Sequence, residues 1–284
     1  MANSVLQNPK VYLLETDFFT QFNLKADEVL DKGMCGEIVL AIPQAKPDLR
    51  RIVKKFSLLD EEHKVRNMRA FQAEVQFMQS LCHPYLTKCL IAGRCQDYQA
   101  ICMYYYSRGT LDSQVGTLSM DLSELCISQV GCALRYLHRH NIAHLDVKLD
   151  NIFLDEDFNA ILGDFGVAIE LHPGQKTVPK SYCGGTPCYH GPERRGAADD
   201  KELDPYRLDS FALGVCMWAL MMGRQPGLKI DYFYEARKNQ DLPSYIRELL
   251  LKLLDRSPGK RVTIPGFLLR LRKKSIHRQV INSH

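Results

Sequence analysis

The order of apolar and polar positions divides the chain into a strand-rich first part and a helix-rich remainder. The segment 28–42 holds two short apolar runs around Gly33 and Gly36, which predicts a β-hairpin. The segment 50–56 alternates between apolar and polar residues and predicts a third strand. The segment 67–81 then changes to apolar positions three or four residues apart, which is typical of a helix.

Longer helical patterns follow in the rest of the chain. Apolar residues recur at helical spacing over 120–138, and the segments 206–222 and 244–255 are apolar enough to predict buried helices. The pattern changes near 103–109, which we interpret as the joint between two parts. The sequence therefore predicts an α+β fold with a small β-rich part followed by a larger α-helical part.

Composition and charge exclude several classes of protein. The 284 residues are 45% hydrophobic and 25% charged, which is ordinary for a globular protein. The formal net charge of +4 is too small to indicate nucleic-acid binding. The N-terminus does not resemble a signal peptide, and no apolar run reaches the roughly 18 residues that a membrane span needs. Ten cysteines without a C-x-x-C pair fit free thiols, so we expect an intracellular protein, cytoplasmic or nuclear.

Two aspartates, a lysine and an asparagine lie within eight residues at 144–151, in the sequence HLDVKLDN. Asp146, Lys148 and Asn151 follow the spacing D-x-K-x-x-N, and the tripeptide Asp-Phe-Gly begins 13 residues later at Asp164. With His144 included, seven residues stand at set spacings, and at roughly 1 in 20 per residue the probability of this is on the order of 10⁻⁹ per starting position. The combination resembles the catalytic loop and the metal-binding motif of eukaryotic-type serine/threonine protein kinases.

This resemblance implies a bilobal kinase fold, a division of the chain and an activity. An N-terminal extension would cover 1–25, the kinase domain would cover 26–275, and a basic tail would cover 276–284. The β-rich lobe would lie at about 26–103 and the helical lobe at about 107–275. The implied activity is transfer of the γ-phosphate of ATP to serine or threonine hydroxyls of a protein, with ATP and Mg²⁺ as cofactors.

The chemistry of phosphoryl transfer explains the residue types of the cluster, because it depends mainly on positioning and charge neutralisation. The resemblance implies that Asp146 accepts the proton of the substrate hydroxyl and that Lys148 offsets charge on the transferred phosphate. Asn151 and Asp164 would hold Mg²⁺, which prefers oxygen ligands.

The segment 50–56 resembles the strand that carries the ATP-binding lysine of kinases. Either Lys54 or Lys55 can fill this role, and the ending Lys-Lys-Phe favours Lys54. The other lysine would point to the opposite side, because neighbours in a strand face opposite sides. Glu74 resembles the helix glutamate that pairs with this lysine, although a solvated helix charge is the alternative.

Two further segments resemble the nucleotide site. The segment 30–38 resembles the glycine-rich loop, except that Asp31 replaces its first glycine. The segment 100–111 resembles the hinge between the lobes, in which Met103 lies behind the adenine and two tyrosines present backbone groups to it. The residues expected around the nucleotide are Leu30, Gly33, Gly36, Ile38, Ile52, Lys54, Met103, Tyr104, Tyr106 and Phe153.

The segment 184–193 resembles the end of the activation segment of kinases. Thr186, together with Lys148, fits serine/threonine rather than tyrosine kinases and would lie where the protein substrate docks. Glu193 would form an architectural ion pair with Arg261. A small-molecule kinase of the same fold is disfavoured by this segment, which resembles a peptide-docking element.

Two acidic residues bear on the substrate. Asp150 lies within the catalytic loop, and Glu235 resembles an acidic position with which some kinases bind arginine. A preference for basic substrates and a pair of solvated surface charges are equally good interpretations. The overall appearance resembles baculoviral late kinases, which would act in a host cell on an arginine- or lysine-rich protein such as a DNA-packing protein. We expect no membrane or direct nucleic-acid partner.

Leu145 departs from the family pattern, because most regulated kinases carry arginine at this position and use it to bind a phosphate on the activation segment. The hypothesis that follows is activity without phosphorylation of Thr177, Ser181 or Tyr182. Asp209 would tie the catalytic loop to a core helix. The competing interpretation is a pseudokinase that binds nucleotide or partners without catalysis, which Asp31 and the bulky Ile52 favour.

Overall fold

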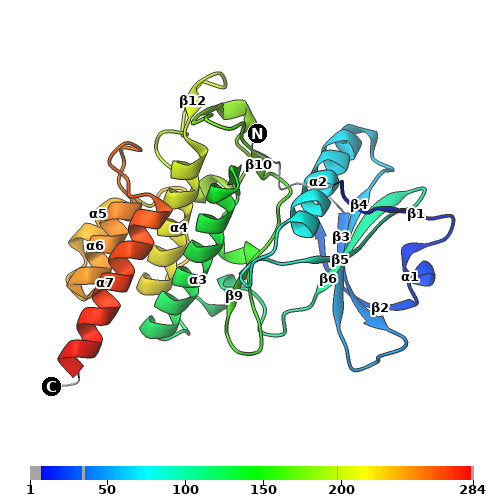
Figure 1. Cartoon of the computed structure of the whole chain (residues 1–284), viewed down its shortest axis with the longest axis horizontal. Coiled ribbons are helices and arrows are strands. Elements are labelled where there is room, and N and C mark those ends of the chain that lie inside the picture. The colour runs from blue at the N-terminus through cyan, green and yellow to red at the C-terminus, as the bar shows by residue number, and fades with distance from the viewer. Residues whose placement is uncertain (1–7, 34–35, 197, 283–284) are drawn as a thin grey trace. The chain divides into compact units, whose positions relative to one another are not determined.

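The computed structural model describes residues 8–33, 36–196 and 198–282, with side chains up to Lys273. The chain divides into two compact units (Figure 1). The first unit contains the residues up to Ser107 and, from a later part of the chain, Asp164–Gly166. The second unit contains Arg108–Gly163 and the residues from Val167 onward.

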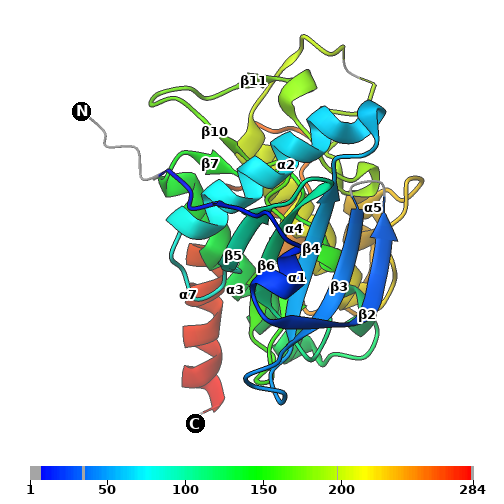
Figure 2. The ribbon, with the colours of Figure 1, turned by 90° about the vertical axis from the view of Figure 1, so that its right-hand side faces the viewer.

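The first unit is built on a six-stranded sheet with the strand order β1-β5-β6-β4-β3-β2. Helix α2 packs against β4, β5 and β6, and Figure 2 shows it beside these strands. Strands β2 and β3 pair as the predicted hairpin, and β4 pairs with β3 and β6. The elements are β1 Tyr12–Leu13, α1 Phe18–Gln21, β2 Leu24–Gly33, β3 Gly36–Pro43, β4 Arg51–Ser57, α2 Glu61–Ser80, β5 Cys89–Arg94 and β6 Tyr98–Tyr104.

Helix α2 is fixed to the sheet by apolar packing. Phe56 of β4 and Phe71 of α2 are buried, and their rings meet edge to face with centroids 5.6 Å apart. Glu74 lies three residues after Phe71, so both side chains lie on one face of the helix. Asp60 caps the start of the helix by accepting a hydrogen bond from the amide of Glu62. The packing therefore directs Glu74 towards the sheet.

The described residues of the expected N-terminal extension, 8–25, contact the rest of the first unit. Strand β1 pairs with β5 in parallel, with Tyr12 opposite Gly93. Asp17 caps the short helix α1, and Phe18 is fully buried in a cluster that includes Val53. Residues before and after position 25 thus share one apolar cluster, and the domain boundary expected there stays a prediction.

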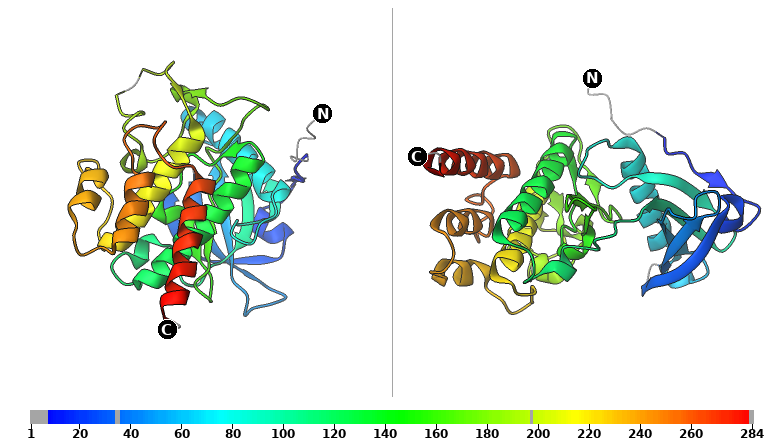
Figure 3. Two further views of the ribbon diagram at one scale, coloured as in Figure 1. Left: turned by 60° about the vertical axis from the view of Figure 1, so that its left-hand side comes forward. Right: turned by 90° about the horizontal axis from the view of Figure 1, so that it is seen from below.

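The second unit consists mainly of helices, with α3 packed against both α4 and α7, as both views of Figure 3 show. Its helices are α3 Met120–Arg139, α4 Pro205–Met222, α5 Tyr232–Lys238, α6 Ser244–Leu253 and α7 Ile264–Asn282. Its strands are β7 Ile142–Ala143, β8 Ile152–Leu154, β9 Ala160–Leu162, β10 Ile169–Glu170, β11 Val178–Pro179 and β12 Glu202–Leu203. Single turns of 3₁₀ helix occur at Asp112–Gln114, Leu149–Asn151, Lys180–Tyr182 and Pro187–Tyr189.

Helix α4 forms the centre of the second unit, because residues on all its sides are buried. Asp204 caps its start, Pro205 occupies its first turn, and Gly223 ends it with a left-handed φ of +61°. This matches the buried helix predicted over 206–222. Within the described part of the chain, no helix is both long and apolar enough to cross a membrane. The α+β architecture predicted from the sequence, with a β-rich first part and a larger helical second part, is confirmed.

Candidate active site

Of the two neighbouring lysines, Lys54 reaches the carboxylates of Glu74 and Asp164. Its Nζ forms an ion pair with Glu74 and lies 2.9 Å from Oδ1 of Asp164. Lys55, its neighbour in β4, instead places Nζ 3.1 Å from Oε2 of Glu37. The geometry therefore favours Lys54 for a role in binding phosphate, as the ending Lys-Lys-Phe predicts.

Burial and charge act against each other in this ion pair. Burial alone would lower the pKa of Lys54, but the carboxylates of Glu74 and Asp164 outweigh it and raise that pKa above its ordinary value. Burial also raises the pKa of Glu74, while the ammonium of Lys54 opposes the rise. The lysine is therefore held as a cation, which is the form that a phosphate would contact.

Of the two glycines in the β2–β3 hairpin, only Gly36 occupies a position that excludes a side chain. Gly36 has a φ of +140°, and a Cβ there would lie 2.0 Å from the carbonyl oxygen of Lys55. A Cβ at Gly33 would meet no described atom within 4 Å. A side chain at Gly33 would therefore meet no described neighbour, whereas one at Gly36 would collide with the backbone of β4. Met34 and Cys35, between them, lie outside the described residues.

The residues expected around the adenine fall in both units. Ile38, Ile52 and Met103 occupy the adjacent strands β3, β4 and β6, and Ile52 stands opposite Met103 in the ladder. Leu30 lies in β2, and Tyr104 ends β6 with its ring beside the guanidinium of Arg51 at 5.3 Å. The hydroxyl of Tyr106 donates to Thr87 at 3.3 Å, and Phe153 lies in β8 of the second unit.

The catalytic loop of the second unit brings the predicted catalytic residues together. Asp146 accepts a hydrogen bond at Oδ1 from the hydroxyl of Thr186 at 2.8 Å, and its Oδ2 lies 3.3 Å from Nζ of Lys148. Lys148 also donates to the hydroxyl of Thr186 at 3.2 Å. Asn151 donates from Nδ2 to the backbone and carboxylate of Asp146 at 2.9 and 3.0 Å. One carboxylate is thus oriented by three neighbours.

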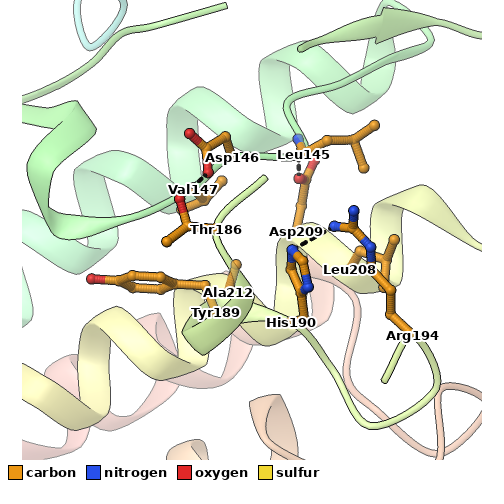
Figure 4. A pocket seen from close by; sticks show the side chains of 10 residues that line it. All are labelled: Leu145, Asp146, Val147, Thr186, Tyr189, His190, Arg194, Leu208, Asp209 and Ala212. Atoms are coloured by element: carbon orange, nitrogen blue, oxygen red, sulfur yellow. Dashed lines mark hydrogen bonds between the residues drawn. The ribbon is translucent and has the colours of Figure 1, made fainter. Parts of the chain in front are cut away.

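The backbone just before Asp146 is held in an unusual conformation by a buried carboxylate. Leu145 has a φ of +64°, which costs a residue with a side chain about 1–2 kcal/mol. Asp209 is fully buried and accepts hydrogen bonds from the amides of Leu145 at 2.8 Å and His144 at 2.9 Å. Nε2 of His138 lies 2.9 Å from the same carboxylate. Figure 4 shows Asp209 beneath the loop.

The two acidic residues expected to bind substrate differ in their surroundings. Asp150 is exposed, and its charge together with burial raises the pKa of the neighbouring Asp112 carboxyl, with burial the larger cause. Glu235 forms an ion pair with Arg224 at 2.8 Å. The carboxylate of Glu235 is therefore already paired, whereas Asp150 lies close enough to Asp112 for its charge to contribute to the raised pKa there. The sequence does not predict the proximity of Asp112 to Asp150, because Asp112 lies 38 residues earlier and in no motif.

The predicted pair of Glu193 and Arg261 forms in the second unit. Arg261 is 1% exposed and donates from Nη1 and Nη2 to the Glu193 carboxylate at 2.6 and 2.8 Å. Arg261 also donates to the carbonyl of Arg207 at 2.8 Å. A paired and hydrogen-bonded buried charge of this kind fixes the end of the activation segment, which we define as residues 164–193.

The donor atoms present fit a nucleotide with Mg²⁺. Lys54 supplies a cation for phosphate, and the oxygens of Asn151 and Asp164 are ligands that suit a hard cation. Both hydrogen bonds from Asn151 use Nδ2, so neither of them uses the oxygen that could bind Mg²⁺. Over the described part of the chain, three or more His, Cys, Asp or Glu side chains nowhere gather in a way that could hold a metal.

Comparison with known proteins places these motifs in a family. The model of the protein kinase domain matches residues 24–270. The chain is 29% identical to the human NUAK family SNF1-like kinase 1 over 252 residues, which are 84% of this chain and 36% of that protein. It is 31% identical to the serine/threonine-protein kinase akt-1 of Caenorhabditis elegans over 249 residues, covering 83% of this chain and 44% of the relative.

An Aurora kinase of the yeast Debaryomyces hansenii is 27% identical over 252 residues, covering 84% of this chain and 58% of the relative. The chain thus spans less than two thirds of the length of each of these relatives. None of these three proteins is viral, so the likeness to baculoviral kinases gains no support from them. Because the domain match includes the glycine-rich loop, the catalytic loop and the activation segment, the chain belongs to the protein kinase family and is related to its serine/threonine kinases.

Proposed function

We propose that the chain is an active kinase that transfers the γ-phosphate of ATP to serine and threonine hydroxyls of proteins. The observation that carries this proposal is the arrangement of Asp146, which is oriented by Lys148, Asn151 and the hydroxyl of Thr186. A carboxylate held in this way can accept the proton of a substrate hydroxyl as the new O–P bond forms.

Each residue near Asp146 has a separate task in this mechanism. The substrate hydroxyl takes the place of Thr186 as hydrogen-bond donor to the carboxylate or shares it with Thr186. Lys148, 3.3 Å from Asp146, offsets negative charge that develops on the transferred phosphoryl oxygens. Bound Mg²⁺, held by Asn151 and Asp164, would supply further charge neutralisation at the phosphates.

Lys54 binds and orients the nucleotide phosphates in this proposal. Its position is fixed by Glu74, a residue of helix α2 that is 1% exposed. A cation held by a buried carboxylate loses little conformational freedom when it binds phosphate, which favours a productive geometry. Leu30, Ile38, Ile52, Met103, Tyr104, Tyr106 and Phe153 would contact the base, and Gly33 would admit the phosphates.

We also propose a preference for basic substrates and activity without phosphorylation of the activation segment. The exposed Asp150, whose charge also acts on Asp112, would attract arginine or lysine near the acceptor residue. Leu145 cannot bind a phosphate, so a phosphorylated segment would gain no partner there. An arginine-rich DNA-packing protein is a suitable substrate class, in a viral or cellular setting, inside a cell.

The decisive experiment is a phosphotransfer assay with Asp146→Asn. The variant should retain the thermal shift that Mg-ATP produces and lose turnover by about 10³-fold or more, because the proton acceptor is removed while the fold is kept. Asp157→Asn is the matched control, since Asp157 is exposed and carries the same substitution. Wild-type turnover by Asp146→Asn would refute the assigned role. Binding of nucleotide by a wild-type chain without any turnover would instead establish the pseudokinase.

A further inference from the structure

Arg194, to which the kinase motifs assign no role, holds the end of the activation segment within the second unit. Its Nη1 donates to the carbonyl of Gly184 at 2.5 Å, and its Nη2 donates to the carbonyl of Cys183. Nη1 also lies 2.7 Å from Nε2 of His190, which must be the acceptor because a guanidinium only donates. One side chain therefore joins the two ends of the segment 183–190, as Figure 4 shows at His190.

The backbone that carries Arg194 is anchored in the core. The preceding residue, Glu193, is bound through both carboxylate oxygens by the buried Arg261. The amide of Arg194 donates to the carbonyl of Gly191 at 3.1 Å, which closes a turn at this point. Because its base is fixed in this way, the guanidinium restrains the segment instead of following its movements.

The other side of the segment lies against the catalytic loop. Gly185 has a φ of +118°, and a Cβ there would lie 2.3 Å from the carbonyl oxygen of Leu145. The Leu145 side chain is 7% exposed and belongs to an apolar cluster. The cluster joins the catalytic loop to the activation segment and its flanks, through Ala143, Leu145, Leu171, Val178, Cys183, Leu203 and Leu208.

These contacts bear on the catalytic carboxylate through one short stretch of chain. Thr186 follows Gly184 by two residues, and its hydroxyl donates to Asp146 at 2.8 Å. The hydrogen bonds to the carbonyls of Cys183 and Gly184 therefore hold the backbone just before Thr186, whose hydroxyl contacts Asp146. Movement of the segment by about 1 Å would be enough to disturb a reaction of this kind.

We propose that Arg194 is a positioning residue that holds the activation segment against the catalytic loop without a phosphate on the segment. The proposal rests on the phosphotransferase function proposed above. Arg194 would hold the activation segment in place of the arginine–phosphate contact that Leu145 cannot make. The two acceptors are backbone carbonyls, so the contact needs no phosphate at Thr177, Ser181 or Tyr182.

The test compares three variants of the full chain after complete treatment with a phosphatase. Arg194→Ala removes the contacts, and Arg194→Lys keeps the charge but loses the planar fork that reaches two carbonyls. Arg195→Ala is the matched control, because Arg195 is the exposed neighbour. The measurements are kcat and KM with a serine peptide and Mg-ATP, and hydrogen exchange of the amides in 180–190.

Arg194→Ala should lower kcat by about 10- to 100-fold, change KM for ATP by less than about twofold, and accelerate exchange in 180–190 by about tenfold or more. Arg194→Lys should lie between it and the wild type, and Arg195→Ala should match the wild type. If Arg194→Ala fails to fold, the comparison of Arg194→Lys with Arg195→Ala decides by the same readouts.

Wild-type kcat, or wild-type exchange in 180–190, in both Arg194 variants would overturn the proposal. Loss of wild-type turnover on phosphatase treatment would overturn it as well, because the segment would then need its phosphate. Hydrogen exchange needs no turnover. A wild-type chain that is inactive under all conditions would therefore refute the proposed function, while the exchange rates would still decide whether Arg194 holds the segment.

Discussion

Replacing Asp209 with asparagine tests how the catalytic loop is held, and the structure allows its cost to be worked out. The carboxylate accepts from the amides of Leu145 and His144 through different oxygens, and an asparagine has only one oxygen to offer. Its NH₂ group would face one of the two amides, donor against donor. The lost charge-assisted hydrogen bond is worth about 1.5–3 kcal/mol, and the buried amide left unsatisfied costs about 1–3 kcal/mol.

We therefore expect Asp209→Asn to lower the free energy of unfolding by about 2–4 kcal/mol, since the two contributions overlap. Urea denaturation measures this change. We expect a larger effect on kcat than on the free energy of unfolding. Without the Asp209 carboxylate, Leu145 gains about 1–2 kcal/mol by leaving its left-handed conformation. That change would move Asp146, the next residue, and we expect kcat to fall by about 100-fold.

The control for this experiment is Asp157→Asn, which carries the same substitution at an exposed position and should change neither quantity. An unfolding free energy of Asp209→Asn within about 0.5 kcal/mol of the wild type would refute the hydrogen-bond reasoning. A destabilised variant with full kcat would refute the link between the conformation of Leu145 and the position of Asp146.

Three other predictions concern single side chains. Lys54→Met should lower phosphotransfer by about 100-fold or more while Lys55→Met lowers it only a few-fold, and equal losses in a peptide assay would contradict the choice of Lys54. Arg261→Met leaves the Glu193 carboxylate buried without its partner and should cost about 3–5 kcal/mol in thermal or urea unfolding, so a change under 1 kcal/mol would be inconsistent with the ion pair. Burial, and then the charge of Arg194, lowers the pKa of His190 from 6.5 to about 4. As the pH falls, His190 therefore binds a proton in the unfolded chain before it does so in the folded one. It should destabilise the fold progressively from pH 6.5 to pH 4, by about 1 kcal/mol after solvent screening of the half-exposed ring. His190→Gln should remove this part of the pH dependence of unfolding, and an unchanged profile would disprove it.

The sequence was sufficient where short-range patterns carry the structure. Alternation in β4 and helical spacing in α2 placed Lys54 and Glu74 on their elements, and the D-x-K-x-x-N spacing kept Asp146, Lys148 and Asn151 within one loop. The chemical roles of these residues stay predictions until the assays above are done. The choice between Lys54 and Lys55 required the structure, because it depends on which side chain reaches Glu74 across the sheet.

Contacts between distant segments could not be predicted in this way. Phe18 enters a core with Val53 and Cys102, although no periodic pattern links these parts of the chain. The role of Arg194 depends on a backbone path that turns back from 194 to 183, and a carbonyl acceptor leaves no mark in the sequence. The ion pair of Glu235 with Arg224 likewise depends on the meeting of two helix ends.

The short strand β1 has a consequence for handling the protein. An uncovered strand edge offers free amides and carbonyls to other chains and promotes aggregation. Residues Tyr12–Leu13 cover one side of β5, and Phe18 fills the apolar cluster beneath that part of the sheet. A chain shortened to begin at residue 26, where the kinase motifs begin, would expose this edge together with the apolar surface under Phe18. Such a truncation should therefore self-associate during expression, whereas a start before β1 should give a monodisperse protein.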